Sequence, residues 1–410
     1  MPSQVQPEGS FMQAEGESAP HSVSACAKGL LHVLTITPFY PKVGNESGGC
    51  FVAEPLAELS KAGVQSSVFA VEPFYRPKPH TSTSSSPNDA WYRYPALPGG
   101  FGLASSGSGL FVRLRAPAEK LHARSPIDVI HAHGALPCGH AAELLSRHLK
   151  IPFVVTVHGL DAFSSRQVSG WPGAKCVRVS RRVYGAARRV IGVSRRVCDV
   201  VQDGTGGISA AWVVYNGVDP SLFTPGSDPA QPVLLSVGNL IPTKGHELIV
   251  HTLAALLPEF PDLTWEVIGE GPELNRIRAL AERLGVLNSV RFQGRRNRSD
   301  VAEACRQCTV FVLPSRYEGL GCVYLEAMAS GKVAIGCRGQ GIEEIIQHGR
   351  NGWLVGPDSV EELAAALSSL LGSRALRESI AAQGRETVLA GFTVRHQAER
   401  LAAVYRKSIP

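Results

Sequence analysis

Apolar runs rich in β-branched residues alternate along the chain with longer segments whose apolar residues recur at helical spacing. This alternation is typical of β-α-β units, in which helices join buried parallel strands. In the first half, strands are predicted at residues 30–37, 66–71, 127–133, 153–158, 190–194 and 212–215. In the second half, strands are predicted at residues 233–238, 264–269, 290–294, 309–314 and 333–336. Beyond residue 360 the pattern is helical only. The pattern therefore predicts an α/β chain with two doubly wound parallel sheets.

Two stretches lack this periodicity. Residues 73–109 hold six prolines and a run of Ser and Thr, which predicts a long irregular insertion. The other stretch, which ends at residue 232, holds four prolines with Gly and Asp. We place the linker between two domains there, at residues 221–232. The first domain is then predicted at residues 29–220 and the second at residues 233–390.

Composition is that of a globular protein of more than one domain. The chain has 410 residues, of which 44% are apolar, and no stretch of about 18 uncharged apolar residues could span a bilayer. Residues 1–28 are polar and lack the apolar core of a signal peptide, so we expect a disordered tail. Nine cysteines without framework spacing favour reduced thiols in a cytoplasmic protein. The close pair Cys305 and Cys308 has no second pair, so zinc binding is the less favoured interpretation.

The net charge of +6 is unevenly distributed. Between Ala162 and Cys198 there are nine Lys and Arg residues and no acidic residue, so the rest of the chain carries a net charge of −3. A helical wheel places five arginines on one face: Arg178, Arg181, Arg182, Arg188 and Arg189. Such a face is either solvated or lies on an anionic membrane surface, and both interpretations stay open.

Two carboxylates bracket a glycine turn between a predicted strand and a predicted helix. Glu318 follows the apolar run 308–313, and Glu326 lies about one turn into the helix that follows Gly321. The helix N-terminus can hold a phosphate on free N–H groups, and glycines let a ligand approach the backbone. The alternative is a solvated loop Glu and a helix-surface Glu. However, an unpaired carboxylate in the otherwise uncharged helix around Glu326 would be costly, which favours a functional role.

This segment resembles the signature of the retaining GT-B glycosyltransferases of the "group 1" family: Glu, seven residues, Glu, then Ala-Met-Ala and Gly. Further segments match the family in its order, at residues 157–159, 187–194, 216–219, 237–245, 267–272 and 351–355. The resemblance runs from about Leu31 to the C-terminus. It implies two Rossmann-like domains facing across a cleft, with a final helix, here at residues 391–410, that crosses back to the first domain.

The resemblance also implies roles for single residues. The catalytic residues it implies are His158, Lys244 and Glu318. The donor-binding residues it implies are Gly48, Gly49, Asn239, Gly269, Gly271, Arg295, Gly319, Leu320, Gly321 and Glu326. In this assignment Glu326 accepts from the ribose of a nucleotide, Glu318 binds the donor sugar and Lys244 meets the leaving phosphate. His158 contacts the sugar near the reaction centre.

Neighbouring residues refine this assignment. Asp161 could orient the ring of His158. Of the two histidines that close the preceding strand, His133 is the better pocket candidate and His131 the weaker one. The family usually has Arg where this chain has Asn239, so half of the usual cationic clamp is missing; Arg316 or Arg295 could replace it. No Asp-x-Asp pair or metal-spaced cluster appears, so no metal or other cofactor is needed to explain diphosphate binding.

The resemblance thus implies a cytoplasmic, metal-independent, retaining glycosyltransferase. It would move a sugar from a UDP- or GDP-sugar to a saccharide or lipid-linked acceptor, in polysaccharide or glycolipid assembly, with no nucleic-acid partner. Acceptor binding is expected along residues 73–109, and membrane contact would be peripheral. Two alternatives remain: a nucleotide-sugar-binding or regulatory protein with weak turnover, suggested by Asn239, and a GT-B phosphorylase.

Overall fold

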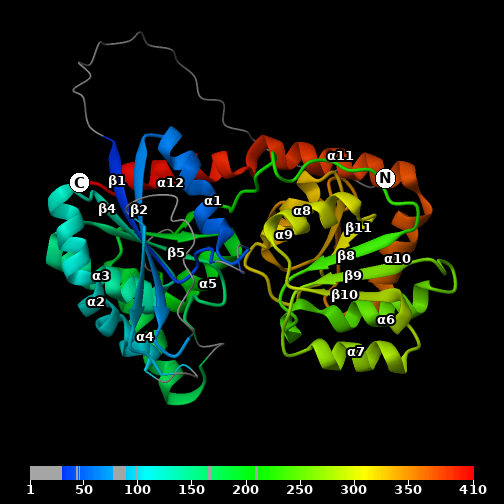
Figure 1. The fold of residues 1–410 in the computed structure, drawn as a ribbon, viewed down its shortest axis with the longest axis horizontal. Coiled ribbons are helices and arrows are strands. Elements are labelled where there is room, and N and C mark those ends of the chain that lie inside the picture. The colour runs from blue at the N-terminus through cyan, green and yellow to red at the C-terminus, as the bar shows by residue number, and fades with distance from the viewer. Residues whose placement is uncertain are drawn as a thin grey trace, which may run out of the picture.

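The computed structural model describes residues 30–42, 45, 47–76, 89–97, 100, 102–164, 168–207 and 211–410. The tail predicted at residues 1–28 lies outside these residues. Two parallel sheets, each covered by helices, lie side by side along the long axis of the molecule (Figure 1). The prediction of two doubly wound, Rossmann-like domains is therefore confirmed.

The first sheet has seven strands in the order β3-β2-β1-β4-β5-β6-β7, and neighbouring strands run parallel. Its strands are β1 (Leu31–Thr37), β2 (Val64–Pro73), β3 (Ala90–Tyr94), β4 (Val129–His133), β5 (Phe153–Val157), β6 (Arg189–Gly192) and β7 (Trp212–Val213). The helices of this half are α1 (Cys50–Lys61), α2 (Leu103–Arg124), α3 (His140–Leu149), α4 (Gly170–Ala186) and α5 (Arg195–Thr205). The central strands are buried on both faces, which explains why their sequences are mostly apolar.

The second sheet has six parallel strands in the order β10-β9-β8-β11-β12-β13. Its strands are β8 (Val233–Val237), β9 (Thr264–Ile268), β10 (Val290–Gly294), β11 (Val310–Val312), β12 (Val333–Cys337) and β13 (Trp353–Val355). The later helices are α6 (His246–Leu256), α7 (Leu274–Arg283), α8 (Arg298–Gln307), α9 (Cys322–Ala329), α10 (Val360–Gly372), α11 (Arg374–Gly391) and α12 (Val394–Arg406). Side chains at the carboxyl ends of these strands form the edge on which ligands bind in such sheets.

The last helix returns to the first domain, as predicted. Figure 1 shows α12, in red, beside α1 and over the first sheet. Leu401 and Tyr405 of α12 share a buried apolar cluster with Leu59 of α1. Where the chain crosses back, the N–H of Val218 donates to Phe392 O at 3.0 Å and the N–H of Val394 donates to Val218 O at 3.0 Å. The two connections between the domains therefore run side by side.

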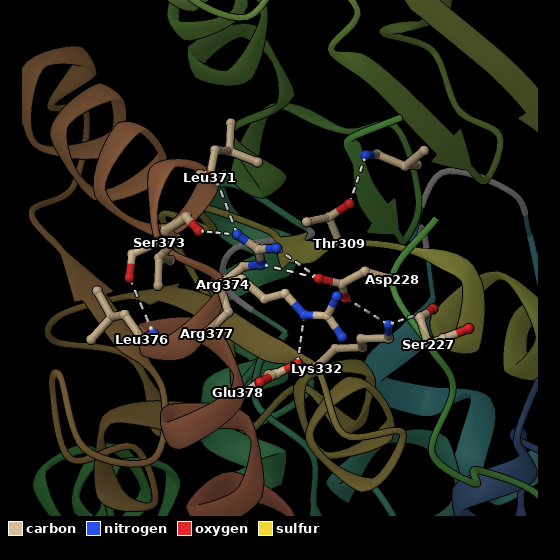
Figure 2. A network of polar contacts seen from close by, with 12 residues as sticks. Ser227, Asp228, Thr309, Lys332, Leu371, Ser373, Arg374, Leu376, Arg377 and Glu378 are labelled. Atoms are coloured by element: carbon tan, nitrogen blue, oxygen red, sulfur yellow. Dashed lines mark hydrogen bonds and ion pairs between the residues drawn. The ribbon is translucent and has the colours of Figure 1, made fainter. Parts of the chain in front are cut away.

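The connection that precedes β8 is held to the second domain by charge. Asp228 accepts from Lys332 Nζ at 3.2 Å and from Arg377 Nη2 at 2.7 Å, and Lys332 also donates to Ser227 O at 3.2 Å (Figure 2). Lys332 is buried, so this pairing offsets the cost of removing its charge from water. Residues 221–232 contain no helix or strand, and their assignment as the linker stays a prediction.

Two short strands, β3 and β13, were not predicted from the sequence. The stretch at 73–109, predicted as irregular, contains β3 and the start of α2, and the remainder of that prediction lies partly outside the described residues. β3 pairs with β2 and places aromatic and apolar residues at the edge of the sheet. The prolines on both sides obscured it. The other missed strand, β13, has only three residues.

Candidate functional site

The two predicted catalytic loops meet between the sheets. His158 follows β5 of the first domain, and Glu318 and Gly319 follow β11 of the second. A Cβ atom at Gly319 would lie 2.1 Å from the carbonyl oxygen of His158, so only glycine allows this approach. The hydroxyl of Ser194, at the start of α5, donates to Gly319 O at 2.6 Å. Backbone from both domains is therefore in direct contact at the site.

Lys244 and Glu318 form an ion pair. Lys244 ends a short 3-10 helix, Pro242–Lys244, that follows β8, and the two side chains are only 18% and 14% exposed. The backbone N–H of Glu318 donates to Gln340 Oε1 at 3.0 Å, which fixes the loop. The structure thus brings two of the three predicted catalytic side chains into contact. An anionic phosphate and a sugar hydroxyl are the ligand groups that can exchange with such a pair.

The ring of His158 is oriented by another histidine. His158 Nε2 and His133 Nδ1 are 2.9 Å apart, and the two rings are stacked with centroids 5.2 Å apart. Phe39 and Phe51 pack against the other sides of the His158 ring. Burial lowers the pKa of His158 to about 3, so the ring is neutral near pH 7.

The predicted role of Asp161 in orienting this ring is wrong. Asp161 Oδ1 accepts from the backbone N–H of His158 at 2.9 Å, so it fixes the loop and leaves the ring to His133. Burial raises the pKa of Asp161 to about 6. Hydrogen bonds from backbone N–H groups lower this pKa, but their effect is smaller than that of burial. His131 is bonded to Thr156 Oγ1 at 2.7 Å and to the hydroxyl of Tyr405 in α12 at 2.8 Å, which are contacts of the core.

Glu326 lies inside α9 and is 2% exposed. Burial raises the pKa of this carboxyl, and the guanidinium of Arg298 opposes the rise. Arg298 Nη1 donates to Glu326 Oε1 at 2.5 Å, and the same guanidinium binds Glu54 of α1 at 2.7 and 3.1 Å. Neither Arg298 nor Glu54 was predicted as a site residue. The only signal in the sequence was the carboxylate in an uncharged helix, which needs a cation, but the sequence does not show which of the chain's cations supplies it.

The glycines of the β9 loop allow close packing of two loops. A Cβ atom at Gly269 would lie 1.9 Å from Gly238 O, and one at Gly271 would lie 2.2 Å from Leu240 O. The loop that includes the exposed Asn239 is therefore held against residues 269–271. A role of Gly269 and Gly271 in donor binding stays a prediction.

Of the two arginines predicted to replace the family's arginine at Asn239, Arg316 is the more tightly held. Its guanidinium donates to Asp358 at 2.5 Å, Glu247 at 2.6 Å and Pro242 O at 2.9 Å, so this proposed substitute is already bound. Arg295 is more exposed, and it contacts Glu270 at 3.5 Å and Asn45 Oδ1 at 2.8 Å. Arg295 is therefore the less tightly held of the two, and the replacement of the missing cation stays a prediction.

The loop before α1 faces this side of the second domain. Gly49 has φ +87° and a Cβ atom there would lie 2.4 Å from the backbone of Phe39, so this turn requires glycine. A Cβ atom at Gly48 would collide with the side chain of Asn45. Ser47 Oγ donates to Arg296 O at 3.2 Å. Gly48 and Gly49 therefore lie at the junction of the domains, which is where their predicted role requires them.

Within the described part of the chain, no group of three His, Cys, Asp or Glu side chains could hold a metal ion. Cys305 and Cys308 are buried thiols, and the Cys308 thiol donates to Cys305 O at 3.4 Å. The packing of this pair is that of core residues.

The basic surface differs from its prediction. Helix α4 ends at Ala186, so Arg188 and Arg189 do not share its face; Arg189 is the first residue of β6. Arg182 is paired with the buried Glu143 at 3.1 Å. Arg178 is exposed on the same helix as Trp171, which is 76% exposed. Across the described residues, no helix combines the length and apolarity needed to cross a membrane.

The arrangement of two parallel-sheet domains with a returning helix defines a GT-B fold, and comparison with solved structures agrees. Sucrose-phosphate synthase from Thermosynechococcus elongatus superposes with a TM-score of 0.73, at 21% identity over 92% of this chain and 98% of that one. Anabaena HepE in complex with UDP-glucose superposes with a TM-score of 0.71, at 20% identity over 92% and 100%.

Sequence comparison gives the family. Residues 220–387 match the model "Glycosyl transferases group 1", and residues 51–222 match "Glycosyltransferase Family 4". The chain is 30% identical over 295 residues to the glycogen synthase of Mycobacterium tuberculosis, which covers 68% of each chain. The chain belongs to the group 1 glycosyl transferases, and it is a glycosyltransferase.

Proposed function

We propose that this glycosyltransferase is a retaining enzyme that transfers a sugar from a UDP- or GDP-sugar to an acceptor hydroxyl without a metal ion. The observation that carries the proposal is the Lys244–Glu318 pair, which lies between the domains beside the His158 loop. The crystal structure of a structural neighbour, Anabaena HepE, is of its complex with UDP-glucose. This supports a nucleotide sugar as the donor.

Each side chain then has a role that its chemistry allows. The ammonium of Lys244 binds the leaving diphosphate, and the Glu318 carboxylate accepts from a sugar hydroxyl. Amides of Gly319, Leu320 and Gly321 at the start of α9 bind sugar and phosphate oxygens. Neutral His158 can donate or accept one hydrogen bond with the sugar, because its other nitrogen is bonded to His133. Lys244 and these amides supply the charge stabilisation that a metal ion supplies elsewhere.

Retention follows if the acceptor attacks on the face that the diphosphate leaves. In this mechanism the leaving phosphate oxygen takes the acceptor proton, and the protein holds both substrates in place. Closure of the two domains excludes water and limits hydrolysis of the donor. Glu318 binds a hydroxyl in this scheme and forms no covalent bond.

The acceptor class that we propose is a growing polysaccharide or a glycolipid, reached by a cytoplasmic enzyme that binds the membrane surface peripherally. Support for membrane contact comes from Trp171 and Arg178, an exposed aromatic and an exposed cation on one helix. Residues 73–109 remain the proposed acceptor side.

A second candidate function is nucleotide-sugar binding with weak turnover. Two features favour it: Asn239 is neutral, and the guanidinium of Arg316 is bound to Glu247 and Asp358. Both leave less positive charge for the diphosphate. A GT-B phosphorylase is a third candidate that no contact in the site favours.

Binding and turnover assays separate these functions. The protein is titrated with UDP and GDP and then assayed with UDP- and GDP-sugars and soluble saccharide acceptors. The Glu326→Ala variant should bind the nucleotide about 10- to 150-fold more weakly, the equivalent of about 1.5–3 kcal/mol for a charged hydrogen bond. Donor-dependent release of nucleotide supports the transferase. Binding without turnover on every acceptor would favour the second candidate, and phosphate-dependent release of a sugar phosphate would favour the third.

A further inference from the structure

Arg298 joins carboxylates that belong to different domains. It is the first residue of α8, and its guanidinium donates to Glu326 Oε1 at 2.5 Å in the second domain. It also donates to both oxygens of Glu54 in α1 of the first domain, at 2.7 and 3.1 Å. The side chain of Arg298 is only 16% exposed, and that of Glu54 is 21% exposed.

This placement of an arginine is costly by itself. The N-terminus of a helix is the positive end of its dipole, which disfavours a cation at the first position of α8. Burial of the guanidinium adds a desolvation cost. Two carboxylates and the ring of Phe223, 4.6 Å from the guanidinium carbon, offset these costs. The site is therefore built around Arg298 by side chains from both domains.

The geometry leaves the inner carboxylate able to bind a ligand. Arg298 binds Oε1 of Glu326, so the second oxygen, Oε2, can still accept from neighbouring hydroxyls of a ligand. The contact with Glu54 holds the guanidinium away from Oε2, because two of its nitrogens are bound to α1. An arginine released from Glu54 would be free to bind both oxygens of Glu326 in a bidentate pair.

We propose that Arg298 is a positioning residue for the nucleotide: it holds the Glu326 carboxylate in place, and through Glu54 it makes this site depend on the first domain. The inference rests on the proposed function, in which Glu326 accepts from the ribose hydroxyls. A residue of the first domain then changes the affinity for a nucleotide that the second domain binds.

The charged state of Glu326 gives this role a distinct pH signature. Burial raises the pKa of Glu326, Arg298 lowers it and Glu54 raises it. Cys50 of α1, Cys305 of α8 and Cys322 of α9 also face this group, but burial raises the pKa of each thiol far above neutrality, for Cys50 to about 12. Loss of Arg298 therefore raises the pKa of Glu326 further, and the carboxylate takes up a proton at a higher pH than in the wild type.

The test measures the Kd of UDP and of GDP by calorimetry from pH 6 to pH 8.5. At each pH the Kd of the variant is divided by the Kd of the wild type, so that the titration of the nucleotide phosphate cancels. Arg298→Gln should bind the nucleotide at least tenfold more weakly at pH 7.5, and the deficit should grow as the pH falls. Arg298→Lys keeps the charge and should restore the flat pH profile with part of the affinity. Glu54→Gln should weaken binding three- to tenfold at every pH, because the freed arginine competes for Oε2.

Controls separate this inference from the proposed function on which it rests. Arg291→Gln removes an exposed arginine of β10 that pairs with Glu266 of β9, and it should bind like the wild type. If Glu326→Gln binds both nucleotides normally, or the wild type binds neither, the ribose assignment fails and the inference fails with it. If Glu326→Gln weakens binding while Arg298→Gln matches the wild type across the pH range, the inference alone is overturned. Thermal melts test whether each variant is folded. If Arg298→Gln does not fold, Arg298→Lys replaces it in the comparison.

Discussion

Replacement of Glu318 by Gln perturbs the Lys244–Glu318 pair and leaves the shape of the site unchanged. The pair is 18% and 14% exposed, between an exposed ion pair and a fully buried one. Exposed pairs contribute about 0.2–1 kcal/mol, and breaking a buried pair costs about 3–5 kcal/mol. We therefore expect Glu318→Gln to lower the free energy of unfolding by about 1–3 kcal/mol.

Nucleotide binding and catalysis should respond in opposite directions: binding should stay the same or strengthen, and turnover should slow. Lys244 loses its counter-ion, so its attraction for a diphosphate increases, and the Kd of UDP or GDP should stay unchanged or fall up to about fivefold, which corresponds to about 1 kcal/mol. The sugar loses a charged hydrogen bond of about 1.5–3 kcal/mol, so kcat should fall about 10- to 150-fold.

Steady-state kinetics with the active donor, calorimetry with the nucleotide and a thermal melt measure these three quantities. Glu266→Gln, which breaks an exposed pair with Arg291 on the same domain, is the matched control and should leave all three near the wild-type values. A Glu318→Gln variant with normal kcat would contradict the role of Glu318 in sugar binding, because the pair would then serve stability alone. Weaker nucleotide binding with unchanged kcat would refute it as well.

The remaining predictions concern charge elsewhere in the molecule. Asn239→Arg should hold or raise kcat if the diphosphate lacks a second cation, whereas a large loss would show that the pocket suits a neutral residue. Asp161→Asn should remove one contribution to the pH dependence of stability: the folded-state pKa of about 6 lies above the unfolded value, so the stability that Asp161 contributes is greatest below pH 4 and is lost as pH rises through 6. Melts of both proteins from pH 4 to 7.5 test this, and parallel curves would contradict it. The double variant Arg178→Glu, Arg188→Glu should sediment less with anionic vesicles at low salt than the wild type does. Equal sedimentation of variant and wild type would show that this surface does not bind membranes. Arg182 is left intact because it pairs with a buried carboxylate.

Much of the fold was predictable because parallel strands buried on both faces have apolar sequences. β1, β5 and β10 begin or end within one residue of their predicted bounds. β3 was not predictable, because it has only five residues and prolines flank it in the sequence. The helical wheel failed at Arg188 because its backbone N–H donates to Phe153 O at 2.8 Å, which directs the chain toward β6 where the wheel assumed another helical turn.

The site was predictable where it depends on sequence position at strand ends. Glu318, Lys244 and His158 each follow a strand, and the parallel sheets bring them to the junction of the domains. Contacts between elements that lie far apart in the sequence cannot be predicted in this way. Arg298 lies 28 residues from Glu326 and 244 from Glu54, and the bond between His133 and His158 depends on the pairing of β4 with β5.

The central claim, retaining transfer, is tested most directly by the anomeric configuration of the first product. The wild-type enzyme is incubated with the active nucleotide sugar and acceptor inside an NMR tube, and the coupling constant of the new anomeric proton is recorded before any secondary reaction. We expect the product to keep the anomeric configuration of the donor, so an α-linked donor gives an α-linked product. A product of the opposite configuration would contradict it.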